Sequence, residues 1–99
     1  MIWNIISRKE EYLYRDVYTR FIEIDIHAIK VLTSCKTIDQ CNNCFEWCLN
    51  MIRNLQQYST NQYNNCSYKY KSLWQSLLLE LDRSVFYYKI AYKLQIQSL

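Results

Sequence analysis

Five cysteines are the residues of this chain whose type and spacing suggest chemistry most directly. Cys41, Cys44 and Cys48 follow one another at intervals of three and four residues, so in a helix all three project from one narrow sector. Thiolates at this spacing can share one soft metal ion, and Cys35 lies just upstream of them. The second Cys-X-X-Cys pair that zinc knuckles require is missing from the sequence, and Cys66 stands far from the rest. A metal site, disulfides and plain core packing are therefore three interpretations of these thiols.

The apolar residues around the thiols favour core packing. They recur at intervals of 3, 4, 3, 4 and 3, which is the seam of an amphipathic helix: Ile38, Cys41, Phe45, Cys48, Ile52 and Leu55. A buried cysteine behaves as a small hydrophobe. Disulfides are disfavoured because Cys35 and Cys66 flank a predicted helix about 30 Å long, whereas a disulfide needs Cα atoms within about 7 Å of each other. We therefore expect a cysteine-rich core helix that holds no metal and no cofactor.

Arg20 and His27 are a second pair of chemically capable residues. They lie two turns apart on the polar side of a predicted helix, with Glu23 between them. The spacing R-x6-H resembles the R-x4-6-H motif of HEPN-type helical ribonucleases, in which an Arg and a His flank a scissile phosphate. The resemblance implies RNA cleavage that depends on Arg20 and His27, although Phe21 stands where that family usually has a polar residue. A solvated helix ridge with a Glu23–His27 pair is the alternative. We favour this alternative and expect no catalytic residue and no enzymatic activity.

The first of three predicted helices spans residues 7–33. Ser7 and Glu10 form an S-x-x-E capping box ahead of a long periodic run. Two apolar stripes follow, and the second widens the face made by the first: Leu13, Val17, Phe21, Ile24, Ala28 and Val31, then Tyr14, Tyr18, Ile22, Ile26 and Ile29. A helix this apolar is expected to touch two neighbours.

Two further helices are predicted over residues 37–58 and 66–97. A T-x-x-Q capping box at Thr37 and Gln40 follows a short turn and starts the second helix. The polar residues 59–65 predict a mobile loop. The third helix is long for a compact chain, so it should either break near residues 82–84 or extend to a partner. Its stripe comprises Tyr70, Trp74, Leu77, Leu81, Val85, Tyr88, Tyr92, Ile96 and Leu99.

Composition indicates one soluble, all-α domain over residues 1–99. Apolar residues make up 51% of the chain and charged residues 21%, and there is neither glycine nor proline. The predicted architecture is an antiparallel up-down-up three-helix bundle, with dimerisation as a further way to bury apolar surface. The richness in Ile, Asn, Lys and Tyr is typical of AT-rich genes, which favours a viral or mobile-element origin. Neither a signal peptide nor a membrane span is recognisable in the sequence, so we expect a cytoplasmic protein that does not enter membranes.

One stripe of the third helix predicts a protein-binding face. Leu79, Phe86 and Ile90 share a helix sector with Arg83 and Lys93, on the side opposite the predicted core. Large apolar residues on a solvated face are unusual in a monomer. We interpret this stripe as a contact surface for a protein partner or a second copy of the chain, so the predicted function is that of a small interaction protein that modulates or inhibits a larger complex.

A lysine- and tyrosine-rich segment near the predicted loop is the second candidate surface. Tyr63, Tyr68, Lys69, Tyr70 and Lys71 alternate aromatic rings with positive charges, which could stack on bases and contact phosphates. The same tyrosines could instead anchor the segment to the bundle. Since the net charge is only +3, we favour protein contacts over nucleic-acid binding.

Overall fold

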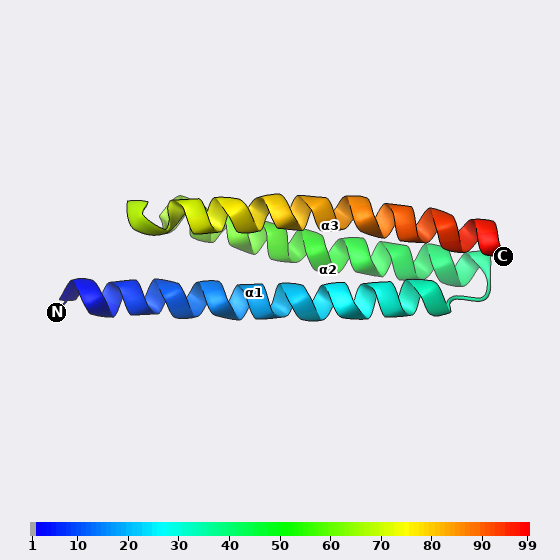
Figure 1. Cartoon of the computed structure of the whole chain (residues 1–99), viewed down its shortest axis with the longest axis horizontal. Helices are drawn as coiled ribbons and strands as arrows, with labels where there is room; N and C mark the ends of the chain where they lie inside the picture. Colours follow the sequence, from blue (N-terminus) through cyan, green and yellow to red (C-terminus); the bar gives the residue numbers. More distant parts are fainter. Residues whose placement is uncertain (1) are drawn as a thin grey trace.

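Three long helices run side by side and form a rod (Figure 1). They are α1 (Ile2–Ser34), α2 (Ile38–Asn65) and α3 (Lys71–Ser98), with a short 3₁₀ helix, η1 (Tyr68–Tyr70), before α3. The computed structural model describes the backbone of residues 2–99 and the side chains from residue 9 onward. Each helix packs against both others in an up-down-up order, which confirms the predicted all-α antiparallel bundle. The bundle is a rod of 58 × 16 × 14 Å.

The connection between α1 and α2 has the predicted capping interactions. The Thr37 side chain accepts a hydrogen bond from the backbone N–H of Gln40 at 3.1 Å. The Gln40 side chain accepts one from the N–H of Lys36 at 2.9 Å. Together these bonds satisfy donors that the start of α2 and the preceding turn would otherwise leave unpaired. The turn therefore occupies residues 35–37, close to the prediction.

The predicted start of α1 is wrong. The helix begins at Ile2 rather than at Ser7, whose side chain lies outside the described residues. Glu10 binds elsewhere: its carboxylate accepts hydrogen bonds from the backbone N–H of Ser67 at 3.1 Å and from the Ser67 hydroxyl at 2.9 Å. The Ser7–Glu10 spacing is compatible with a helix interior, and Glu10 instead ties α1 to the connection between α2 and α3.

The predicted loop over residues 59–65 is also wrong, because α2 continues to Asn65. Ser59 is 0% exposed and extends the buried seam of α2 beyond Leu55. Tertiary packing of this turn outweighs its weak helix propensity. The true connection is residues 66–67 with η1, so α3 begins at Lys71, later than predicted. No break occurs at residues 82–84.

The core runs through the centre of the rod. Trp74 and Tyr88 are its largest fully buried side chains, and Tyr14 of α1 packs edge-on against Trp74 with ring centroids 5.6 Å apart. The predicted seam of α2 is confirmed at its centre: Cys41, Cys48, Ile52 and Leu55 are all buried. None of the helices, over the described residues, is long and apolar enough to cross a membrane.

Candidate protein-binding surface

Five residues of α3 form a continuous exposed stripe, which we call the outer stripe: Leu79, Arg83, Phe86, Ile90 and Lys93. They recur at intervals of 4, 3, 4 and 3 residues, so they line one side of the helix. Phe86 is 61% exposed, a large fraction for an aromatic side chain. In the described part of the chain the ion pairs are Arg15–Glu11 and Arg20–Asp16, so Arg83 and Lys93 take part in neither. The outer stripe is thus apolar, basic and open to solvent.

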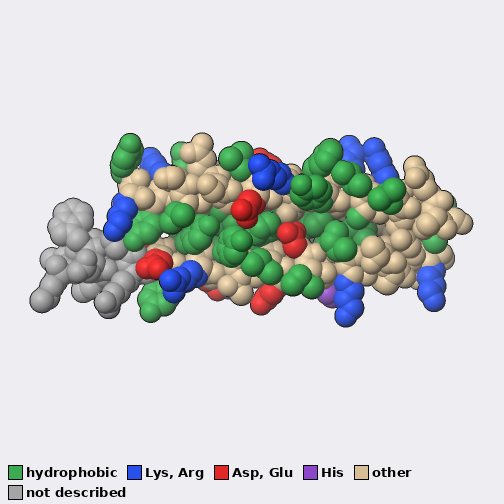
Figure 2. Space-filling model, in the orientation of Figure 1, with side chains coloured by type: hydrophobic (Ala, Val, Ile, Leu, Met, Phe, Trp, Pro, Cys, Tyr) green, Lys and Arg blue, Asp and Glu red, His purple; other side chains and the backbone are tan. Residues whose placement is uncertain are grey.

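A second set of exposed apolar side chains lies along the seam between α1 and α3. Figure 2 views this side of the rod and shows hydrophobic side chains gathered between the two helices. Ile29 and Tyr87 line a small pocket of about 250 Å³ there, and Phe86 packs edge-on against Tyr87 with ring centroids 6.1 Å apart. This contact connects the outer stripe to the seam. Three further exposed apolar residues lie one or two helix turns from Ile29 or Tyr87, and we count them with these two as the seam: Ile22, Ile26 and Leu94.

The sequence did not reveal this seam, because the three isoleucines of α1 were predicted to widen its core face. Tyr14 and Tyr18 of the same predicted stripe do pack against the core. Ile22, Ile26 and Ile29 are exposed instead. In a bundle of three helices each helix contacts only two neighbours, so an apolar face wider than those contacts remains in solvent.

A buried polar group lies beneath the seam and fixes the two helices relative to each other. The hydroxyl of Tyr88 donates a hydrogen bond to the Asp25 carboxylate, and the Ser84 hydroxyl donates another at 3.3 Å. Burial raises the pKa of Tyr88 above its usual value, and the Asp25 hydrogen bond and charge raise that pKa further. The phenol therefore stays protonated and remains a donor to Asp25.

The lysine- and tyrosine-rich segment does not form one continuous face. Tyr68 is 91% exposed, whereas Tyr70 is 8% exposed and belongs to the core. Each lysine lies over a tyrosine ring: Lys69 Nζ is 5.5 Å from the ring centroid of Tyr70, and Lys71 Nζ is 5.7 Å from that of Tyr63. These cation–π contacts hold both ammonium groups against the protein. The tyrosines here thus anchor the segment more than they present a stacking platform.

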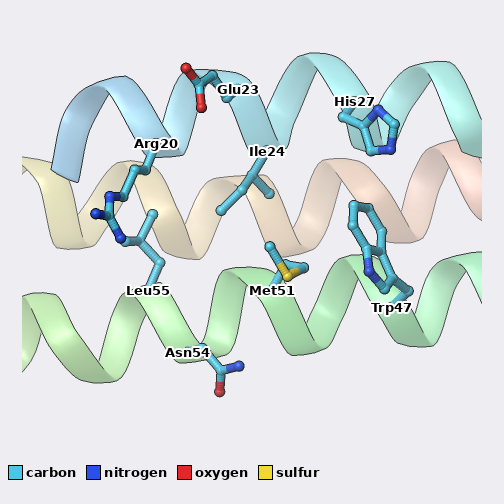
Figure 3. Close-up of a pocket in the computed structure, with 8 residues that line it drawn as sticks. All are labelled: Arg20, Glu23, Ile24, His27, Trp47, Met51, Asn54 and Leu55. Atoms are coloured by element: carbon cyan, nitrogen blue, oxygen red, sulfur yellow. The ribbon is translucent and has the colours of Figure 1, made fainter. Parts of the chain in front are cut away.

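Arg20 and His27 line a groove between α1 and α2 (Figure 3). The groove is open to solvent and has a volume of about 610 Å³. Arg20 Nε lies 3.2 Å from the Asp16 carboxylate, which offsets its charge. His27 packs edge-on against Trp47, with ring centroids 5.2 Å apart, and does not form the predicted ion pair with Glu23. Arg20 and His27 thus lie on the same wall of the groove, and the Trp47 ring faces His27 from α2 (Figure 3).

Three of the thiols, Cys35, Cys41 and Cys44, lie close together where α1 ends and α2 begins. Cys35 Sγ lies 3.3 Å from Cys44 Sγ and 3.1 Å from the carbonyl oxygen of Val31. Burial raises the pKa of Cys35 to about 12, and the neighbouring thiols Cys44 and Cys41 contribute to this rise. In the described part of the chain no three His, Cys, Asp or Glu side chains are grouped so that they could hold a metal ion. The contact between Cys35 and Cys44 was not predicted, since it depends on the path of the turn.

Comparisons with known proteins found no protein similar to this chain. No family model, no curated protein and no solved structure matches the chain.

Proposed function

We propose that this chain is a small non-enzymatic interaction protein that binds a partner protein through the outer stripe of α3 and so modulates or inhibits the complex to which that partner belongs. The supporting observation is the exposure of Leu79, Phe86 and Ile90 along one side of a single helix. Monomeric proteins rarely leave such a set of large apolar residues uncovered. Aromatic side chains and arginines are also the residues that dominate binding energy in protein interfaces.

The charges beside the stripe indicate the chemistry of the partner. Arg83 and Lys93 flank the apolar residues, and the positions of the stripe hold no acidic side chain. A complementary surface would present an apolar ridge bordered by carboxylates. An amphipathic, acidic helix meets both requirements, and it could lie along α3 as a further helix of the bundle. Complete burial of a fully exposed Phe side chain stabilises by about 1.5–3 kcal/mol, and covering Phe86, which is 61% exposed, would contribute somewhat more than half of that to binding.

The test compares two aspartate substitutions of exposed aromatic residues. Phe86→Asp places a charge inside the outer stripe. Tyr12→Asp, at a 70% exposed position of α1, is the matched control, because it adds the same charge elsewhere on the surface. Wild-type protein and both variants are used to capture partners from lysates of the producing or host organism, each prepared with and without nuclease. The captured partner is then purified, and its affinity for each variant is measured by calorimetry.

Partner binding should be lost in Phe86→Asp and retained in Tyr12→Asp, with far-UV circular dichroism showing that both variants are folded. Equal affinity of Phe86→Asp and wild type would refute the proposal. So would a capture that disappears with nuclease treatment, since the bound species would then be a nucleic acid. If Phe86→Asp abolished only self-association, the occupant of the outer stripe would be a second copy of the chain. That result would overturn the proposal of a foreign partner.

A further inference from the structure

Cys35 and Cys44 form a pair of thiols whose sulfur atoms lie 3.3 Å apart. We propose that they exchange with small-molecule disulfides such as glutathione disulfide, and that the product is a reversible cross-link between the end of α1 and the second turn of α2. The proposal does not depend on the outer stripe or on any partner protein.

The distance between the two sulfur atoms carries the proposal. Cys35 Sγ and Cys44 Sγ are 3.3 Å apart. The sulfur atoms of a disulfide are about 2.05 Å apart, so the two need to approach by little more than one ångström. Cys35 follows α1 directly and lies in the turn, where rotation of its side chain and small movements of the backbone can bring the atoms together.

The other thiols are less well placed for the reaction. Cys41 also neighbours Cys35, but its side chain is fully buried, so a reagent from solvent cannot reach it. Cys48 is fully buried too, and a bridge from Cys41 or Cys48 to Cys44 would lie within one helix, where it would be strained. Cys66 follows α2, whereas Cys35 precedes it, so the length of that helix separates the two thiols. Cys44, which a reagent can reach, and its neighbour Cys35 are therefore the pair that we expect to bridge.

The solvent exposure of the two thiols indicates which of them reacts first with glutathione disulfide. Cys44 is half-buried and can meet a reagent from solvent, whereas Cys35 is only 5% exposed. Cys44 loses its proton and attacks one sulfur of glutathione disulfide; the sulfur–sulfur bond breaks, and one glutathione leaves and takes up a proton. Cys35 then loses its proton to solvent and attacks Cys44 Sγ, which expels the second glutathione. Two electrons and two protons pass from the cysteines to the two glutathione molecules.

The cross-link would act at a point where all three helices meet. The backbone carbonyl of Cys35 already accepts a hydrogen bond from the side chain of Gln95 in α3, at 2.7 Å. A covalent bond from Cys35 to α2 would join the same turn to the second neighbouring helix. Oxidation would thereby restrict opening of this end of the rod.

The experiment treats the full-length protein with glutathione disulfide and quenches the reaction with an alkylating reagent. Trypsin then separates Cys35 from the other thiols of this region, because cleavage after Lys30, Lys36 and Arg53 releases residues 31–36 and 37–53 as two peptides. Mass spectrometry before and after reduction detects a cross-link between them, and fragmentation identifies the bridged cysteine of the second peptide. Cys44→Ser is the test variant and Cys66→Ser is the control.

The expected product is a monomer in which peptide 31–36 is joined through Cys44, while Cys41, Cys48 and Cys66 are alkylated. The cross-link should be lost in Cys44→Ser, kept in Cys66→Ser and reversed by dithiothreitol. A cross-link through Cys41, a stable glutathione adduct on Cys44 without closure, a dimer linked between chains, or no reaction of the folded protein would each overturn the proposal.

Discussion

Raising the pH from about 8 to about 11 should destabilise the fold, and replacing Cys48 by alanine should remove a defined part of that loss. Cys48 is fully buried in the seam of α2. Its burial, together with the nearby Cys44 thiol, raises its pKa from 9.0 to about 11. Above pH 9 the thiol therefore ionises in the unfolded chain while it stays protonated in the folded chain. The stabilisation is fully present below the unfolded pKa and is lost as the pH rises towards the folded pKa.

The size of this loss follows from the difference between the two pKa values. One pH unit of difference corresponds to about 1.36 kcal/mol, so the elevation from 9.0 to about 11 limits the effect at Cys48 to roughly 2.7 kcal/mol. At about pH 11, where the folded thiol is half ionised, roughly 2 kcal/mol of that amount has been lost. Small domains have total stabilities of about 5–15 kcal/mol, so this is a large fraction. The raised pKa of Cys35, about 12, adds a loss of the same sign.

Urea unfolding followed by far-UV circular dichroism measures the effect, with a phosphine reductant present to keep all thiols reduced. Wild type and Cys48→Ala are compared at about pH 8 and about pH 11. The alanine variant should be less stable at the lower pH, because it loses buried volume, yet its further loss at the higher pH should be smaller than that of wild type by roughly 2 kcal/mol. The tyrosines and the other thiols ionise in both proteins, so their effects on stability cancel when the loss in one protein is subtracted from the loss in the other. An equal loss in the two proteins would refute the reasoning.

Two further substitutions test polar groups inside the bundle. Tyr88→Phe should lower the free energy of unfolding by about 1.5–3 kcal/mol, because Asp25 loses a charge-assisted hydrogen bond. Thermal unfolding measures this loss of stability. The control is Tyr87→Phe, at the exposed neighbouring position, which should leave the midpoint of unfolding unchanged. An equal shift in both variants would contradict the role assigned to Asp25. Ser59→Ala should stabilise the protein by about 1 kcal/mol, since its hydroxyl is buried and has no hydrogen-bond partner among the described residues. Thr60→Ala, at an exposed position of the same helix turn, controls for helix propensity, and a gain no larger than this control would disprove the explanation.

Local signals in the sequence predicted the parts of the fold that depend on a few neighbouring residues. The turn before α2 is an example, because the bonds that Thr37 and Gln40 form depend only on residues 36–40. The number and antiparallel order of the helices followed from long apolar periodicity without glycine or proline. The five residues of the outer stripe likewise share one exposed side of α3, as their spacing predicted.

Features that depend on tertiary contacts were missed. Ser59 occupies a core position of α2, but a hydroxyl side chain gives no hydrophobic signal, so the sequence indicated a loop there. Glu10 matched a local capping pattern, yet its partner Ser67 lies 57 residues away in the chain. The approach of Cys35 to Cys44 requires the turn to fold back on α2, which residue spacing alone cannot specify.

The slender shape of the bundle affects how its assembly state can be measured. A chain of 99 residues has an expected radius of gyration of about 12.6 Å when globular, whereas this rod has one of 16.3 Å. Such a rod diffuses more slowly than a sphere of equal mass, so a single copy will elute from a gel-filtration column ahead of globular standards and resemble a dimer. Light scattering or sedimentation equilibrium, which report mass independently of shape, will distinguish a lone rod from two copies joined along α3.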